Sequence, residues 1–219
     1  MDGRLAVPVL RGSLVRLEPL SLTHAADLAE VAEEERSSYS FTMVPRSGEA
    51  ADYVTAQLNR AGLTPFAQVR VEDGRAVGCT SYCNPRYWPG RDELCAIEVG
   101  WTWLAASAQG TGINAEAKLL LFGYAFETLG VARVDLKTDA RNERSRQAIV
   151  RTGARFEGVL RAWSASWAPG EEGLLRDSAV FSVVPAEWPE VKAGLSERVR
   201  SSLLNPTQAR PTPVPSRPA

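Results

Sequence analysis

Hydrophobic and polar residues alternate along residues 95–104, which is the pattern of a β-strand with two different faces. The apolar positions are Ile97, Val99, Trp101 and Trp103. Glu98, Gly100 and Thr102 fall between them. The alternation predicts that Glu98 points away from the face that carries the tryptophans.

A different period follows this strand. From residue 115 the apolar residues recur at intervals of four and three, which predicts an amphipathic helix over 115–129. These residues are Ala115, Leu119, Phe122, Phe126 and Leu129. Gly130 comes directly after the last of them and is expected to end the helix.

The rest of the chain continues this mixture of periods. Segments 66–71 and 76–82 flank Asp73-Gly74, a pair that favours a tight β-hairpin. Further strands are expected at 14–17, 131–138, 156–163 and 178–184. Helices are expected at 24–35 and 49–60, and from the capping residue Asn142 to Gly153. The order βααβββαβαββ predicts an α+β or α/β domain, with a mixed sheet and helices on its faces.

The chain has 219 residues, which suffices for one substantial core. We expect one domain over residues 1–204, with its core at about 11–190. Residues 205–219 include five prolines and almost nothing to bury, so a disordered tail is expected there.

Composition narrows the classes of partner and compartment. The 25 basic and 26 acidic residues give a net charge of -1, so no global positive field favours nucleic acid or an anionic membrane. Cys79, Cys83 and Cys95 lack the spacing of a structural zinc site and are expected to be reduced thiols. No apolar run reaches the roughly 18 residues of a membrane span, and no signal-like segment begins the chain. A cytoplasmic protein without a metal is expected.

Candidate chemistry lies between the alternating strand and the long helix, in the segment Gln109-Gly110-Thr111-Gly112-Ile113-Asn114. Two glycines let a backbone approach phosphate oxygens closely, and the first amides of a helix have no partners within it. The segment therefore predicts an anion site, although an ordinary strand-to-helix turn has the same composition. Spacing alone also fits a dinucleotide-binding Gly110-x-Gly112-x-x-Ala115 motif, with Asp135 or Glu127 as the ribose acid.

Several motifs in a fixed order resemble one family. Gln109-x-x-Gly112-x-Asn114 is similar to the pyrophosphate motif [QR]-x-x-G-x-[GA], although Asn114 departs from its small last residue. Glu98-Val99-Gly100-Trp101 and Asn142-Glu143-Arg144-Ser145 are similar to two further motifs. Over about residues 11–190 the chain thus resembles the GNAT acetyltransferases, and within them the RimJ/RimL-like branch that acetylates ribosomal-protein N-termini.

The resemblance implies a mainly antiparallel central sheet flanked by helices, and a direct transfer of an acetyl group from acetyl-CoA to a primary amine. The amine could belong to a protein N-terminus, a peptide or a small molecule. The resemblance further implies cofactor contacts from the strand, the turn and the helix that follows residue 142. These residues are Thr102, Trp103, Leu104, Gln109, Gly110, Thr111, Gly112, Ile113, Asn114 and Asn142.

Two residues are assigned to proton transfer. Glu98 is the predicted base, acting through water, with a salt-bridged strand carboxylate as the alternative. The resemblance points to Ser145 as the proton donor, with helix capping by Asn142 and Ser145 as the alternative. RimL has a second glutamate where this chain has Ser164, a departure that leaves Glu98 as the base.

Other questions stay open at this point. Succinyl-CoA is an alternative donor, and a non-catalytic homologue is an alternative to an enzyme. A homodimer through the late strands is compatible with the sequence. Aromatic and basic residues near the hairpin and the late strands are candidates for the acceptor groove: Arg86, Tyr87, Trp88 and Trp163. His24 is expected at the surface.

Overall fold

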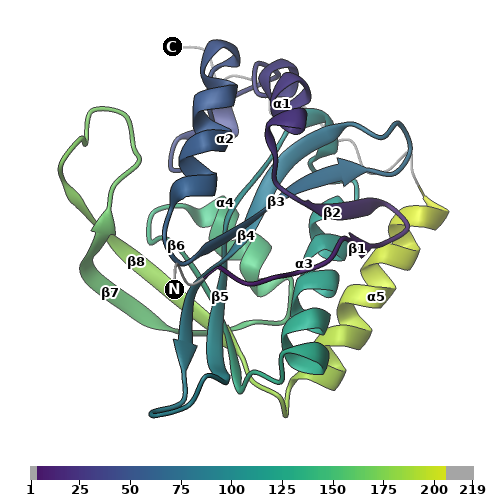
Figure 1. Cartoon of the computed structure of the whole chain (residues 1–219), viewed down its shortest axis with the longest axis vertical. Helices are drawn as coiled ribbons and strands as arrows, with labels where there is room; N and C mark the ends of the chain where they lie inside the picture. Colours follow the sequence, from purple (N-terminus) through teal and green to yellow (C-terminus); the bar gives the residue numbers. More distant parts are fainter. Residues whose placement is uncertain (1–3, 206–219) are drawn as a thin grey trace, which may run out of the picture.

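A computed structural model describes residues 4–205. Its eight strands form one sheet, which lies between helices (Figure 1). The strands are β1 (Leu10–Arg11), β2 (Val15–Pro19), β3 (Leu63–Arg70), β4 (Ala76–Tyr87), β5 (Leu94–Leu104), β6 (Arg133–Asp139), β7 (Arg155–Ala165) and β8 (Leu175–Val183). The α-helices are α1 (Ala25–Val31), α2 (Ala50–Asn59), α3 (Ile113–Gly123), α4 (Glu143–Val150) and α5 (Trp188–Leu204). Short 3-10 turns cover Leu22–His24, Ser37–Tyr39, Ser47–Glu49 and Ala106–Ala108.

The strand order in the sheet is β1-β2-β3-β4-β5-β6-β8-β7. Within the described chain, every pair of neighbours is antiparallel except β5 and β6. The predicted mixed, mostly antiparallel α+β fold is therefore confirmed. The dinucleotide-binding alternative requires a doubly wound parallel sheet, so it is wrong for this chain.

Two elements were not expected from the sequence, the short edge strand β1 and the C-terminal helix α5. Trp188, Val191, Leu195 and Val199 are buried at helical spacing along α5. Trp188 packs against Phe122 of α3, with ring centroids 6.4 Å apart. The helix expected at 115–129 forms α3 followed by a π-helical turn, Tyr124–Thr128. The predicted tail lies outside the described residues beyond Asn205.

The alternation along β5 breaks at Trp101, whose φ of 53° places it in the left-handed region. Gly100 pairs with Ser81, but Trp103 pairs with Cys79, so β5 carries an extra residue against β4. The bulge turns Thr102 toward α3, where its hydroxyl accepts a hydrogen bond from Lys118. Trp103 turns toward α2 and donates to the Tyr53 hydroxyl at 3.1 Å. The prediction that Trp103 shares a face with Val99, opposite Glu98, is therefore wrong.

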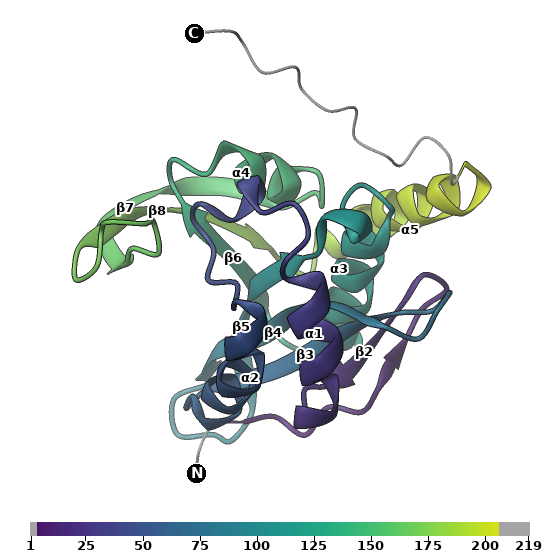
Figure 2. The same ribbon diagram turned by 90° about the horizontal axis from the view of Figure 1, so that it is seen from above.

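Strands β5 and β6 stay together over only part of their length. Ala96, Ile97 and Glu98 pair with Arg133, Val134 and Asp135, and no later pair follows in the described chain. Both strands continue beyond this point, β5 to Leu104 and β6 to Asp139, and they diverge (Figure 2). The divergence opens the sheet between α3 on one face and α2 on the other.

Candidate active site

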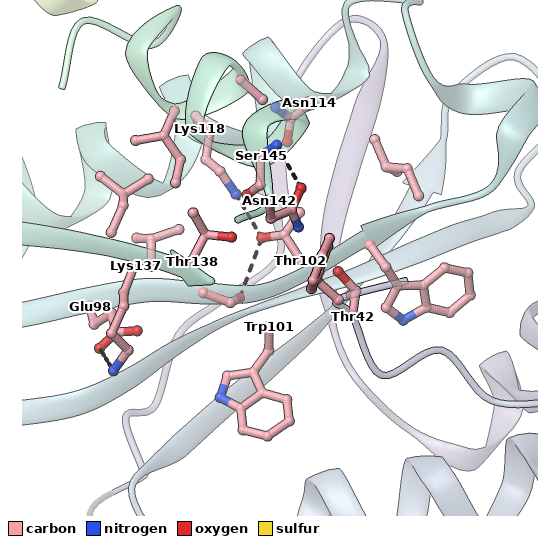
Figure 3. A pocket seen from close by; sticks show the side chains of 18 of the residues that line it. Thr42, Glu98, Trp101, Thr102, Asn114, Lys118, Lys137, Thr138, Asn142 and Ser145 are labelled. Atoms are coloured by element: carbon pink, nitrogen blue, oxygen red, sulfur yellow. Dashed lines mark hydrogen bonds and ion pairs between the residues drawn. The ribbon is translucent and has the colours of Figure 1, made fainter. Parts of the chain in front are cut away.

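A cavity of about 740 Å³ lies where β5 and β6 diverge. Its walls come from both faces of the sheet, and Figure 3 shows Trp101 on one side of the strands and Lys118, Asn142 and Ser145 on the other. All the predicted site residues line it except two. The Thr111 hydroxyl donates to the Ala108 carbonyl at 2.7 Å, and the Ile113 side chain is buried in the core.

The cavity wall is strongly basic, although the whole chain is close to neutral. Its charged residues are Arg60, Glu98, Lys118, Lys137, Arg144, Arg151, Arg176 and Arg198. Glu98 is the one carboxylate among them, so in this part of the described chain basic residues outnumber acidic ones seven to one. Such a wall favours a polyanionic ligand.

The glycine-rich turn opens α3 in the way an anion site requires. Gly110 and Gly112 have φ angles of 76° and 88°, a region that side chains rarely adopt. Gly112 is the N-cap of α3, and no side chain caps the helix start. The first amides of α3 are therefore available to a phosphate, and the residues present fit the pyrophosphate of coenzyme A.

The C-terminal helix closes this end of the cavity. A Cβ atom added at Gly112 would lie 2.5 Å from Ser202 Oγ in α5 and 2.9 Å from Leu14 Cδ1. A bulky residue at Gly112 would thus disturb the packing against Ser202 and Leu14 as well as any ligand. The same helix brings Arg198 into the cavity wall, where its guanidinium donates to the Arg151 carbonyl at 2.5 Å.

The Gln109 side chain braces the turn against β5. Its Nε2 donates to the Leu104 carbonyl at 2.7 Å, and Arg144 donates to its Oε1. The Leu104 carbonyl also accepts from the Tyr39 hydroxyl at 2.9 Å. The Trp103 carbonyl accepts from Gln68 at 3.2 Å. Of the three strand residues predicted to meet the cofactor, Thr102 alone has a carbonyl that no side chain within residues 4–205 occupies.

Glu98 lies at the other end of the cavity with its side chain 13% exposed. Its Oε2 accepts from Asn84 at 2.8 Å and lies 3.3 Å from Lys137 Nζ. Its Oε1 accepts no hydrogen bond from the described residues. One carboxylate oxygen of Glu98 therefore forms the ion pair of the salt-bridge interpretation. The other accepts no hydrogen bond from the described residues, which is compatible with a base that acts through water.

Ser145 and Asn142 stand at the start of α4, on the α3 side of the cavity (Figure 3). Asn142 Oδ1 accepts from the Ser145 backbone amide at 3.0 Å, which is the capping contact that the sequence left open. The Ser145 hydroxyl itself makes no hydrogen bond within the described chain. It is therefore available to a ligand.

Sequence reasoning missed Lys118, which lies on the buried side of α3 with 4% of its surface exposed. A signal was present, because Lys118 falls three residues after Ala115 and four before Phe122, on the face that carries the apolar residues. Its Nζ donates to Thr102 Oγ1 at 2.8 Å.

The aromatic residues that line the cavity differ from those expected for the acceptor groove. Trp101 lies 5.9 Å from Trp167 between ring centroids, and the Arg60 guanidinium lies 4.4 Å from the Trp101 ring centroid. Arg86, Tyr87, Trp88 and Trp163 do not line the cavity. Ser164 does line it, but a serine at that position offers no carboxylate.

The two acids that the dinucleotide interpretation assigned to the ribose form ion pairs outside the cavity. Asp135 forms ion pairs with Arg86 and Arg133. Glu127 accepts from Lys192 at 2.7 Å and from Trp188 Nε1 at 2.8 Å. Neither lines the cavity, which further excludes the dinucleotide interpretation.

Comparison with known proteins decides the family. The acetyltransferase (GNAT) domain family matches residues 15–155. The chain belongs to the GNAT acetyltransferase family. It is therefore an acyltransferase enzyme that uses acyl-CoA and an amine acceptor, and its fold is the GNAT fold.

Individual relatives of this chain agree with the family assignment. The Bacillus subtilis (strain 168) protein called Probable N-acetyltransferase YjcK is 27% identical over 167 residues, which cover 70% of this chain and 87% of that protein. A GCN5-related N-acetyltransferase from Brucella melitensis is 25% identical with a TM-score of 0.78, covering 90% of this chain and 87% of its own. Mycobacterium smegmatis RimJ in complex with CoA-disulfide shares the fold at 20% identity and a TM-score of 0.66, covering 86% and 90% of the two chains.

Two kinds of feature are absent from residues 4–205. None of the helices there is long and apolar enough to span a membrane. No group of three or more histidine, cysteine or acidic residues in that part of the chain is arranged to hold a metal ion.

Proposed function

We propose that this GNAT enzyme transfers the acetyl group of acetyl-CoA to a primary amine, with a protein N-terminal α-amine as the acceptor. The basic cavity at the β5–β6 divergence carries this proposal, because it joins an anion-binding helix start to a carboxylate on the opposite face of the sheet. A long, polyanionic donor and a separate acceptor could enter from the two faces and meet between the strands.

The end of the cavity near Gly112 suits the phosphates of coenzyme A. The uncapped start of α3 would receive the pyrophosphate. Arg144, Arg151 and Arg198 line the same cavity and would neutralise phosphate charge. Coenzyme A would then extend along β5 past Thr102 toward the divergence, where it would present the acyl carbon that the amine attacks.

The acceptor end must make its amine neutral. An α-amine with a pKa of about 8 needs roughly one pH unit of deprotonation near pH 7, whereas a lysine side chain at about 10.4 needs more than three. A single carboxylate acting through water is suited to the smaller task. Glu98, whose Oε1 accepts no hydrogen bond from the described residues, would be this base, which favours an α-amine over a lysine side chain. The fold shared with RimJ and the motifs around Glu98 and Ser145 agree with this choice.

On the donor side, the free hydroxyl of Ser145 would hydrogen-bond to the thioester sulfur. Asn142 holds the helix that carries Ser145 through the capping contact. The backbone of Thr102 would pair with the pantetheine chain. These residues position the donor, so their removal should affect binding and orientation together.

Calorimetric titration of the purified protein tests the donor half of the proposal. Wild-type protein is expected to bind acetyl-CoA and not NADH. Arg198→Gln removes the proposed charge-assisted contact with a phosphate and should weaken acetyl-CoA binding by about 10-fold or more. Arg200→Gln, on the same helix but 69% exposed in an ion pair with Glu197, is the matched control and should leave affinity unchanged. Equal affinities of the two variants would contradict the assigned phosphate end.

Mass spectrometry of peptides incubated with enzyme and acetyl-CoA tests the acceptor half. Peptides with a free N-terminus should gain one acetyl group at the α-amine, while the same peptides with a blocked N-terminus and a free lysine should gain none. Acetylation of lysine alone would overturn the choice of acceptor but leave the acetyl transfer itself in place.

A further inference from the structure

Lys118 differs from the other lysines of this protein. The chain has three, and Lys137 and Lys192 each pair with a carboxylate, Glu98 and Glu127. Lys118 is almost fully buried, yet within residues 4–205 it pairs with none. Its partners are hydroxyls, Thr102 Oγ1 at 2.8 Å and Thr80 Oγ1 at 3.4 Å.

Burial without a counter-ion destabilises the charged form of a lysine, so the lysine loses its proton at a lower pH. Burial lowers the pKa of Lys118 to about 7, and the nearby Cys83 of β4 has a smaller effect in the opposite direction. Glu98 is the one carboxylate among the described residues that line the cavity, and Lys137 lies beside it. They form an ion pair with each other, so neither neutralises Lys118.

The position of Lys118 selects the anion it could meet. It lies six residues after Gly112, so it is about 9 Å along α3 from the phosphate end. Figure 3 shows its side chain on the same side of the strands as Ser145, directed at Thr102. The phosphates have their own cations at the helix start. In acyl transfer the anion that arises further along the cavity is the thiolate of coenzyme A.

We propose that Lys118, rather than Ser145, is the proton donor to the departing thiolate. The inference rests on the proposed function. The acceptor nitrogen forms its bond to the acyl carbon and loses a proton through water to Glu98. The C–S bond breaks, its electron pair goes to sulfur, and the Lys118 ammonium gives sulfur a proton. Lys118 leaves this step neutral and regains its proton from solvent through the open cavity.

The chemistry of the two groups supports this order. A thiol has an ordinary pKa of about 8.5, so its thiolate takes a proton readily from an acid with a pKa near 7. A serine hydroxyl is a far weaker acid and is suited to orient the sulfur instead. The Thr102 hydroxyl fixes the ammonium beside the strand along which the donor is proposed to lie.

Two measurements test the assignment, with Lys118→Gln as the variant and Lys192→Gln, whose side chain on α5 is 49% exposed, as the control. In the wild type the turnover number should fall as pH rises and Lys118 loses its proton. In Lys118→Gln this descending limb should vanish and the turnover number should drop about 10²- to 10⁴-fold. Ser145→Ala should keep the limb. Lys192→Gln should match the wild type.

The second measurement does not require turnover. Ultraviolet titration of bound coenzyme A reports the thiolate, and below about pH 7, where Lys118 still carries its proton, the wild type should hold more thiolate than Lys118→Gln. If Lys118→Gln does not fold, Thr102→Val keeps the lysine, removes its hydroxyl partner and should move the descending limb. Equal amounts of thiolate in the wild type and Lys118→Gln, together with an unchanged limb in these variants, would overturn the inference. Wild-type protein that neither binds nor consumes acetyl-CoA would instead overturn the proposed function.

Discussion

Glu98 is the residue on which the acceptor chemistry depends. Its Oε1 accepts no hydrogen bond in the described chain, whereas Oε2 is held by Asn84 and Lys137. Replacing it by Gln keeps the shape and removes the base. Glu98→Gln should lower the turnover number by about 10²- to 10⁴-fold and leave acetyl-CoA affinity nearly unchanged. Steady-state kinetics with a peptide acceptor, beside calorimetry, measures both.

Glu93→Gln is the control for this substitution, because the Glu93 side chain is 72% exposed and stands outside the cavity. It should behave as the wild type. A turnover number in Glu98→Gln equal to that of Glu93→Gln would show that Glu98 is only a structural partner of Lys137.

Lys118 should also make stability depend on pH. Its folded pKa of about 7 lies below the roughly 10.4 of an unfolded lysine, so the unfolded chain binds more protons between these values. The free energy of unfolding therefore rises with pH in this window, by at most about 1.4 kcal/mol per unit. Lys118→Met lacks this term, and its stability advantage over the wild type should shrink from pH 7 to pH 9. Urea unfolding at the two pH values measures the change, and a constant difference would contradict the burial of a charge at Lys118.

At this scale the sequence predicted residue identities better than residue directions. Glu98, Ser145 and Asn142 do line one cavity, as their motifs suggested. The period-two pattern could not reveal the bulge at Trp101, because a bulge is a backbone event that leaves the order of apolar residues unchanged. Lys118 was overlooked because a lysine between apolar positions of a helix usually extends to solvent.

At the scale of elements, Glu116 fastens α3 to the first strands of the sheet. Its carboxylate accepts hydrogen bonds from the backbone amides of Ser13, Leu14 and Val15, at 2.8, 2.6 and 2.8 Å. Gly12 leaves room for it, since a Cβ there would lie 2.3 Å from Glu116 Cδ. The contact holds the helix whose start forms the predicted phosphate site.

Glu116→Gln should therefore destabilise the protein by about 1–3 kcal/mol. The amide nitrogen of Gln would face a backbone donor, and the three hydrogen bonds would lose their charge assistance. Denaturant unfolding compared with Glu72→Gln, at an exposed turn position, measures the loss. Equal stability of the two variants would mean that the three hydrogen bonds to Glu116 contribute little to the free energy of unfolding.

The elements that the sequence predicted are those with a strong period, such as the strand at β5 and the helix at α3. Helix α5 has a period too, at Trp188, Val191 and Leu195, but Pro189 and Gly194 interrupt it with poor helix formers. Proline is tolerated in the first turn, and tertiary packing against α3 overrides the glycine. The role of α5 as a wall of the cavity could not be foreseen, because it depends on contacts between distant parts of the chain.

At the scale of the whole molecule, one arrangement unites the site. Strands β5 and β6 diverge after Glu98 and Asp135, and the opening joins the two faces of the sheet. The order of elements predicted the mixed sheet around this opening. The distribution of charge was not predictable from composition, since a chain with net charge -1 places its basic residues together only after folding.

Hydrogen exchange with and without acetyl-CoA, read by mass spectrometry, tests the central claim most directly, because the proposed site consists largely of backbone amides. We expect added protection in 109–115 and in 98–104, with weaker protection at the end of α5. Protection confined to other segments, or none at saturating acetyl-CoA, would contradict a donor bound at the start of α3.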